Sequence, residues 1–239
     1  KLEEHVERLF KSAEILDIKI PYSKNKISSA TKQLVSKQKI LNGYIRPFVW
    51  RGSEMMGVSA QKTKINVAIA IWDWPAYFDP DLKKKGIKLN ISKWQRPPQF
   101  SAPWKSKAAG LYMICTLSKH QAEKEGYTDS LMLDYQGNVA EATSANIFFK
   151  DKKNELHTPI PDSFLNGITR KTVIEIAKAK KIKVHERKIS PKELKNFQGC
   201  FITGTAAEIT PVGNILKNKY KVCDLILDLS KTYEKIVGK

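Results

Sequence analysis

Three segments of the sequence stand out because each places polar or glycine residues inside an apolar context. In the first, Lys107 precedes small residues, and Tyr112 follows five positions later. In the second, the carboxylate of Glu141 and the amide of Asn146 lie beside a strand-like apolar run. In the third, Thr205 lies in a threonine-glycine turn after another such run. An amine, a carboxylate and a phenol serve general acid–base and covalent catalysis, so these segments are candidates for an active site.

Two places in the sequence could hold an anion with backbone N–H groups. Gly167 opens a predicted helix, and Gly204 ends a predicted strand. A helix amino terminus carries roughly half a positive charge and unpaired donors, so a phosphate dianion fits there without a glycine-rich loop. The short signatures of nucleotide loops, zinc proteases and serine hydrolases are absent. The four histidines lie far apart in the sequence and predict no metal site: His5, His120, His157 and His185.

The charge of the chain first suggests a polyanionic partner. Lys and Arg number 42 against 24 Asp and Glu, a net charge of 42 − 24 = +18. However, the lysines are spread along almost every segment, without interleaved aromatic residues for base stacking. We therefore favour a solvated lysine-rich surface and expect no nucleic acid partner. A basic nucleic-acid-binding protein or an inactive remnant remains the alternative from a different class.

Composition also limits the class of protein and the cellular compartment. Hydrophobic residues make up 41% of the chain, which is enough to bury a core and excludes a disordered basic tail. No apolar stretch approaches the roughly 20 residues that span a bilayer, so we expect no membrane segment. The three cysteines are odd in number and widely spaced, which indicates free thiols in a reducing compartment. We expect a cytoplasmic protein.

The elements that must position these residues alternate between helices and hairpins. Helical spacing of apolar residues predicts helices over 2–15 and from Ile27 to Val35, a helix from Ala108 to near Gly126, a helix from Gly167, and a last helix with an apolar stripe from Val222 to Ile236. Ser190 to Glu193 forms a predicted capping box. Predicted strands cover 44–50, 65–72, 87–91 and a hairpin from Leu131 past Val139, with an extended loop over 96–103 and a second turn over 151–154. This pattern predicts an α+β fold, with a small domain over 1–77, a linker over 78–86 and a large domain over 87–239.

Five motifs, in this order and spacing, resemble the branched-chain amino-acid aminotransferases, which are fold type IV enzymes that use pyridoxal phosphate. The resemblance implies two domains: a small N-terminal α/β domain and a larger C-terminal, mixed β-barrel-like domain with helices. The family's first segment, ahead of Arg8, is absent, so we expect the small domain to be incomplete in this chain. The motifs are Glu4 to Leu9, Tyr44 to Pro47, Trp74 to Tyr77, Gly167 to Arg170 and Gly204 to Val212.

The resemblance assigns catalytic and cofactor roles to individual residues. It makes Lys107 the lysine that binds the cofactor's aldehyde and moves the reacting proton, a task that favours a neutral amine. Glu141 matches the acid that pairs with the pyridine nitrogen, and Tyr112 matches the tyrosine that hydrogen-bonds the phenolic oxygen. The phosphate would be held by Arg8, Gly167, Ile168, Thr169 and Thr205. Substrate positions are matched by Tyr44, Arg46, Trp74, Tyr77, Thr205 and Ala206, where each aromatic residue could equally be core.

The implied reaction moves an amino group between branched-chain L-amino acids and 2-oxoglutarate, and the implied assembly is a homodimer. In the same fold, a D-amino-acid aminotransferase or an aminodeoxychorismate-lyase-like enzyme is the alternative. One departure concerns the residues after the lysine, where the family usually has glycine and asparagine and this chain has Ala109 and Leu111. This departure bears on pocket shape and substrate preference.

Overall fold

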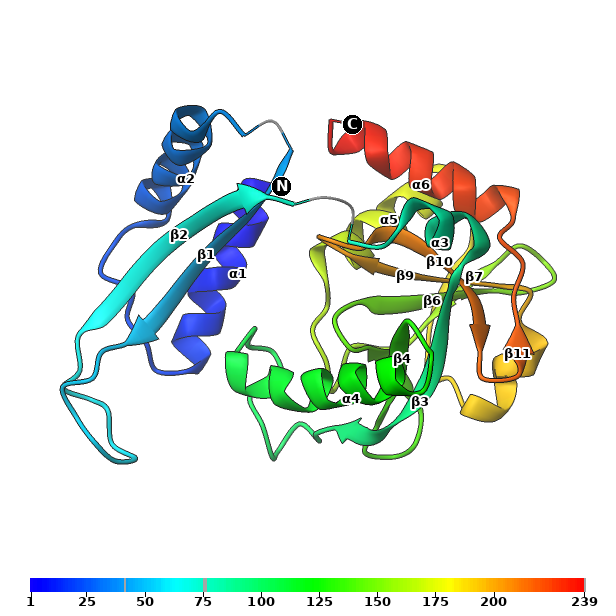
Figure 1. The fold of residues 1–239 in the computed structure, drawn as a ribbon, viewed down its shortest axis with the longest axis horizontal. Coiled ribbons are helices and arrows are strands. Elements are labelled where there is room, and N and C mark those ends of the chain that lie inside the picture. The colour runs from blue at the N-terminus through cyan, green and yellow to red at the C-terminus, as the bar shows by residue number, and fades with distance from the viewer. Residues whose placement is uncertain (41, 75–76, 239) are drawn as a thin grey trace. The chain divides into compact units, whose positions relative to one another are not determined.

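The structure is a computed structural model, which describes residues 1–40, 42–74 and 77–238 (Figure 1). Contacts divide the chain into two compact units. The first unit comprises Lys1–Pro75 with Lys105–Ala108, and the second comprises Ala76–Trp104 with Ala109–Lys239. The motif residues Pro75 and Ala76 lie outside the described residues. The division predicted at 77 and 87 remains a prediction.

The first unit contains two helices and one antiparallel strand pair. Its elements are α1 (Leu2–Ile15), α2 (Lys24–Gln38), β1 (Gly43–Arg51) and β2 (Ile65–Asp73). The Ser23 hydroxyl caps α2 by accepting from the Lys26 N–H at 3.2 Å. Pro47 sits in β1 opposite Ile69, which a strand at a sheet edge tolerates. All four elements agree with the sequence prediction, and α1 has its predicted bounds.

The second unit is built around a mixed sheet with helices. The strand order is β5-β4-β3-β10-β9-β6-β7-β8, and β11 pairs with β10. The pairs β3–β10, β3–β4 and β7–β8 are parallel, and the remaining pairs in the described residues are antiparallel. Its elements are α3 (Pro80–Lys85), β3 (Ile87–Arg96), the 3₁₀ helix η1 (Ala109–Tyr112), α4 (Met113–Lys124), β4 (Asp129–Asp134), β5 (Val139–Ala142), β6 (Asn146–Lys150), β7 (Leu156–Thr158), α5 (Ile168–Ala179), β8 (Val184–Glu186), the 3₁₀ helix η2 (Pro191–Asn196), β9 (Gly199–Gly204), β10 (Glu208–Ile215), β11 (Asn218–Lys219) and α6 (Asp224–Ile236).

The sheet of the second unit curls back on itself. β5 and β6 are far apart in the strand order, yet the Ala142 N–H donates to the Ala145 carbonyl at 2.8 Å in the turn that joins them. Two strands at such distant positions in the sheet can be joined by a short turn only if the strands between them curve round. The sheet therefore forms a half-barrel. Its interior is an apolar cluster that includes Leu131, Ile147 and Ile202. This architecture is the β-barrel-like domain that the sequence predicts.

A second apolar cluster lies on the opposite face of β6 and β9. Because strand side chains alternate, Ile147 and Phe149 enter the first cluster while Phe148 enters the second. Phe148 stacks on Phe201 of β9 with ring centroids 5.0 Å apart, and α5 and α6 contribute apolar side chains to the same cluster. Residues predicted to face inward on α5 are buried, whereas Ile236, the last residue of the predicted stripe on α6, is 53% exposed.

Two predicted boundaries also differ. The helix predicted from Ala108 begins instead as the 3₁₀ turn η1, and the α-helical part begins at Met113. β3 continues past the predicted end at Ile91 to Arg96, because Gln95 and Arg96 pair with the end of β4 after a register shift. Within the described part of the chain, no helix is long and apolar enough to cross a membrane.

Candidate active site

In the first unit, α1 positions both Arg8 and Lys107. The Ser106 hydroxyl donates to the Ser12 carbonyl, and the Lys107 N–H donates to the Ser12 hydroxyl, both at 3.0 Å. Arg8 lies four residues before Ser12, so the two share one face of the helix. The backbone of the candidate catalytic lysine is therefore fixed one helical turn from the candidate phosphate-binding arginine.

His5 belongs to this same face of α1. Its Nδ1 lies 3.4 Å from a guanidinium nitrogen of Arg8. Burial, together with the positive charges of Arg8 and Lys107, lowers the pKa of His5 to about 4. His5 is thus neutral near neutral pH, and its Nδ1 can accept from Arg8. The sequence assigned no role to His5, although its helical offset of three from Arg8 could have indicated the contact.

The candidate substrate residues of the first unit lie on one face of the β1–β2 pair. Tyr44 pairs with Trp72, and the period of two puts Arg46 on the same face as Tyr44. The Tyr44 ring lies 5.1 Å from Trp72 and 4.9 Å from Trp74, and the Arg46 guanidinium lies 5.2 Å from Tyr44 and 5.7 Å from Trp72. These separations suit cation–π contact. Trp72 was missed, although its spacing of two from Trp74 could have indicated it. Tyr77 belongs to the second unit, where its hydroxyl lies 3.2 Å from that of Ser144.

In the second unit, Glu141 is a buried carboxylate held at both oxygens. It is 8% exposed on β5. The Arg96 Nε lies 3.5 Å from Oε1, and the Asn146 amide nitrogen donates to Oε2 at 3.3 Å. A buried carboxylate is costly without such partners, so these contacts favour a charged and oriented Glu141.

Arg96 links Glu141 to the segment that carries Tyr112. This arginine is 3% exposed, and its guanidinium donates to the Leu111 carbonyl at 3.3 Å and to the Cys115 sulfur at 3.4 Å. Burial raises the pKa of the Cys115 thiol to about 11, so the thiol stays protonated. Arg96 was not predicted as a site residue, because the two prolines that follow it indicate an extended loop and hide the end of the strand.

The amino terminus of α5 offers backbone donors close to Glu141. Gly167 is the N-cap residue, and it makes no side-chain cap; Ile168 and Thr169 are the first helical residues. The first N–H groups of a helix lack partners within it, so they can bind an anion. The Gly167 N–H donates to the Asn146 amide oxygen at 3.0 Å. One side chain therefore touches both Glu141 and the start of α5.

Thr205 and Ala206 lie in the turn between β9 and β10, at the same end of the sheet. Asn146 pairs with Thr203, two residues before Thr205. A Cβ on Gly204 would lie 3.6 Å from that of Ala145, which places the turn beside the β5–β6 turn. Within the second unit, the structure thus gathers Glu141, the start of α5 and this turn at one end of the half-barrel. The roles of these residues remain predictions.

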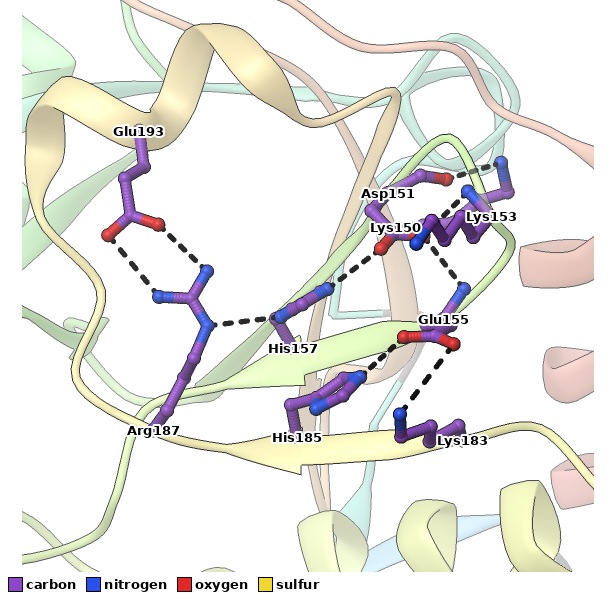
Figure 2. A network of polar contacts seen from close by, with 9 residues as sticks. All are labelled: Lys150, Asp151, Lys153, Glu155, His157, Lys183, His185, Arg187 and Glu193. Atoms are coloured by element: carbon purple, nitrogen blue, oxygen red, sulfur yellow. Dashed lines mark hydrogen bonds and ion pairs between the residues drawn. The ribbon is translucent and has the colours of Figure 1, made fainter.

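Two of the four histidines lie together, away from these residues. His157 and His185 occupy paired positions on β7 and β8, and their rings stack with centroids 4.6 Å apart (Figure 2). His157 contacts Asp151 at 3.1 Å, and His185 contacts Glu155 at 2.5 Å. The two histidines meet because the pairing of β7 with β8 joins residues 28 positions apart in the chain. No three His, Cys, Asp or Glu side chains of the described residues form a group that could hold a metal ion.

The fold and these residues define a class of protein. A half-barrel with a buried carboxylate at one end, beside an open helix amino terminus, is the arrangement implied for the fold type IV enzymes. The family model of the class IV amino-transferases matches residues 1–215, which is most of the chain.

Relatives with curated names agree with the family. A probable branched-chain-amino-acid aminotransferase of Rickettsia felis is 44% identical over 243 residues, which cover 99% of this chain and 81% of that protein. The branched-chain-amino-acid aminotransferase of Pseudomonas aeruginosa is 37% identical over 215 residues, which cover 90% of this chain and 70% of that protein.

Solved structures agree as well. The branched-chain aminotransferase of Thermoproteus uzoniensis with norvaline superposes with a TM-score of 0.93 at 32% identity, over 99% of this chain and 78% of that one. The branched-chain amino acid aminotransferase of Thermobaculum terrenum in its PLP-form gives a TM-score of 0.90 at 28% identity, with the same coverage. The chain belongs to the class IV aminotransferases. The predicted family and fold class are confirmed.

Proposed function

We propose that this protein uses pyridoxal 5'-phosphate to transfer an amino group between branched-chain L-amino acids and 2-oxoglutarate. The observation that carries the proposal is the buried carboxylate of Glu141, held by Arg96 and Asn146 beside the open start of α5. The relatives and solved structures described above, named as branched-chain aminotransferases, support the choice of substrate class.

The residues fit the cofactor at both of its ends. A carboxylate that is 8% exposed and oriented by two donors suits a protonated ring nitrogen, which is a cationic donor. The start of α5 supplies backbone N–H groups for a phosphate, and its N-cap glycine leaves no side chain in the way. The family resemblance assigns Arg8, with its permanently charged, planar guanidinium, to the phosphate as well.

When bound, pyridoxal phosphate supplies an aldehyde that binds the amino group and a ring that withdraws electrons from the reacting carbon. Lys107 takes the proton from the substrate Cα and returns it at the other reacting carbon, because a neutral amine is a competent base. Glu141 keeps the proton on the ring nitrogen by its negative charge. Tyr112 donates its hydroxyl proton toward the phenolic oxygen. Each of these roles is performed by a side chain of this protein that is held in a fixed position.

The aromatic face of β1 and β2 suits substrates of two kinds. Tyr44, Trp72 and Trp74 present ring surfaces that an apolar branched side chain can contact, and Arg46 offers a charge to the second carboxylate of glutamate. Tyr77, Thr205 and Ala206 complete the proposed substrate contacts, with the turn's backbone N–H groups receiving the substrate carboxylate. Both half-reactions then use one set of residues.

The test compares two lysines that lie two positions apart. Lys107→Ala should lower kcat for L-leucine with 2-oxoglutarate by at least about hundredfold, since it removes the acid–base group. Lys105→Ala is the matched control and should stay within about twofold of the wild type. Borohydride reduction of the wild type, followed by peptide mass spectrometry, should place the pyridoxyl group on Lys107.

Several outcomes would contradict the proposal. A colourless wild-type protein that cannot be reconstituted with pyridoxal phosphate would exclude the enzyme. A preference for D-alanine over L-leucine would favour the D-amino-acid alternative. Equal losses in both lysine variants would remove Lys107 from its role.

We also propose a cytosolic homodimer. The three cysteines are unpaired in the described structure, with Cys115 and Cys200 buried, as expected for a reducing compartment. The family resemblance implies that two copies complete each site. Size-exclusion chromatography with light scattering at low micromolar concentration tests the assembly, and a monomer that retains full activity would overturn it.

A further inference from the structure

Asn146 uses both of its N–H donors and its carbonyl oxygen in hydrogen bonds within the second unit. Its amide nitrogen donates to the Glu141 Oε2 at 3.3 Å and to the Leu165 carbonyl at 2.9 Å, and its amide oxygen accepts from the Gly167 N–H at 3.0 Å. The residue is 4% exposed. A primary amide has two N–H donors in one direction and its oxygen in the other, so only one orientation satisfies two acceptors and one N–H together.

The backbone around Asn146 fixes where this amide lies. Asn146 is the first residue of β6 and pairs with Thr203, and the preceding turn is closed by the bond between Ala142 and Ala145. Glu141 lies in β5, on the other side of that turn. The amide therefore joins two strands to the loop that leads into α5.

Gly167 leaves room for the Asn146 side chain because it has no Cβ. A Cβ at Gly167 would lie 2.3 Å from the Asn146 amide oxygen, a distance that real Cβ atoms essentially never show. The backbone of Gly167 is extended, with φ −60° and ψ 144°, so alanine could adopt it without strain. The glycine is thus explained by the close approach of Asn146 and not by its own dihedral angles.

We propose that Asn146 is a positioning residue that sets the distance between the Glu141 carboxylate and the amino terminus of α5. This inference rests on the proposed function, in which Glu141 meets the ring nitrogen and the start of α5 meets the phosphate of pyridoxal phosphate. A rigid cofactor gains from both contacts only if they are spaced to match it. Asn146 makes no contact with the reacting atoms; it acts through the two groups that it holds.

The experiment uses the purified holoenzyme, resolved to apoenzyme and titrated with pyridoxal phosphate or with pyridoxal, which lacks the phosphate. Four variants are compared with the wild type: Asn146→Ser, Gly167→Ala, their combination, and Asn90→Ser. Asn90 is a matched control, because it is also buried in the second unit and donates to a glutamate, Glu125, at 2.7 Å. Thermal unfolding and the absorbance of the bound cofactor against pH are recorded for each.

Both single variants should weaken pyridoxal phosphate binding by about tenfold, because buried polar partners lose their hydrogen bonds. The advantage of pyridoxal phosphate over pyridoxal should shrink by a similar factor, since the two ends of the site no longer match. The combined variant should add at most about twofold, because both substitutions remove the same contact. Asn90→Ser should lower thermal stability and leave the affinity ratio and the spectrum unchanged.

A purely structural Asn146 would lower the unfolding temperature and keep the wild-type ratio of affinities, and this result would overturn the inference. Additive losses in the combined variant would overturn it too. If Asn146→Ser does not fold, Gly167→Ala decides the question through the absorbance of the bound cofactor against pH. A displaced Asn146 loosens Glu141 and changes this profile, whereas a Cβ that only obstructs the phosphate at the start of α5 leaves it unchanged. A wild type that binds no cofactor contradicts the proposed function instead.

Discussion

At the scale of single residues, His5 shows how neighbouring charges fix a protonation state. Its pKa is lowered to about 4 by burial and by the charges of Arg8 and Lys107. An unfolded histidine titrates near about 6.5. Between these values the unfolded chain binds more protons than the folded protein. The contribution of neutral His5 to the free energy of unfolding is therefore fully present above about pH 6.5 and is lost as the pH falls toward about 4.

We therefore predict that His5→Gln makes the protein less sensitive to acid. Glutamine has no proton to gain in this range, yet it offers an oxygen that can accept from Arg8. The free energy of unfolding, measured with urea at about pH 7 and about pH 5, should fall less in the variant than in the wild type. His120→Gln, at an exposed position of α4, is the control and should lose as much as the wild type. An equal loss in all three proteins would contradict the explanation.

At the scale of elements, local signals in the sequence were sufficient for most helices and turns. The apolar spacing of 2–15 predicts α1, and the hairpin after Leu131 is present as β4 and β5. The capping box predicted at Ser190 and Glu193 is present, although the element is a 3₁₀ helix. Two guanidinium nitrogens of Arg187 donate to the two carboxylate oxygens of the same Glu193, at 3.3 and 2.8 Å (Figure 2). These features depend on residues within a few positions of one another, so the sequence alone reveals them.

Elements that depend on distant partners were predicted less well. The residues just before η1, Ser106 and Lys107, hydrogen-bond to Ser12, more than 90 residues away. β3 extends to Arg96 only because β4 offers partners beyond a register shift. Neither effect leaves a periodic signal in the local sequence.

The same division holds for the candidate site. The motif residues Lys107, Tyr112 and Glu141 could be named from the family resemblance, because the motifs have fixed order and spacing. The residues that position them had to be found in the structure. Arg96 holds Glu141 from a strand that the prolines after it conceal, and Trp72 joins the aromatic face through strand pairing. Positioning is a property of tertiary contacts, and a single sequence carries little information about it.

At the scale of the whole molecule, the net charge of +18 concerns the protein surface and contributes little to folding stability. The described ion pairs are mostly lysine pairs with exposed carboxylates, such as Lys11 with Glu7 and Lys84 with Asp81. Pairs of this kind contribute at most about 1 kcal/mol each, so the charge is chiefly a property of the surface. The stability of each unit must come from its buried apolar residues instead.

The two units differ sharply in that respect. Among the described residues of the first unit, the fully buried apolar side chains are Val6, Ala13 and Ile27, and no residue of β2 is fully buried. The second unit has two apolar clusters, one inside the half-barrel and one beneath α5 and α6. Because the free energy of local opening follows buried apolar contact, the first unit should open at a lower free energy than the second.

Native-state hydrogen exchange tests this order of opening. The amides of β1 and β2 should exchange through openings of low free energy, whereas those of β6 and β9 should exchange only near the global free energy of unfolding. Ile202→Ala should cost about 2 to 5 kcal/mol, because it leaves a cavity inside the half-barrel. It should speed exchange in β6 and β9 and leave the rates of β1 and β2 unchanged. Equal protection in both units of the wild type, or a matching acceleration in β1 and β2 of the variant, would show instead that the two units open as one.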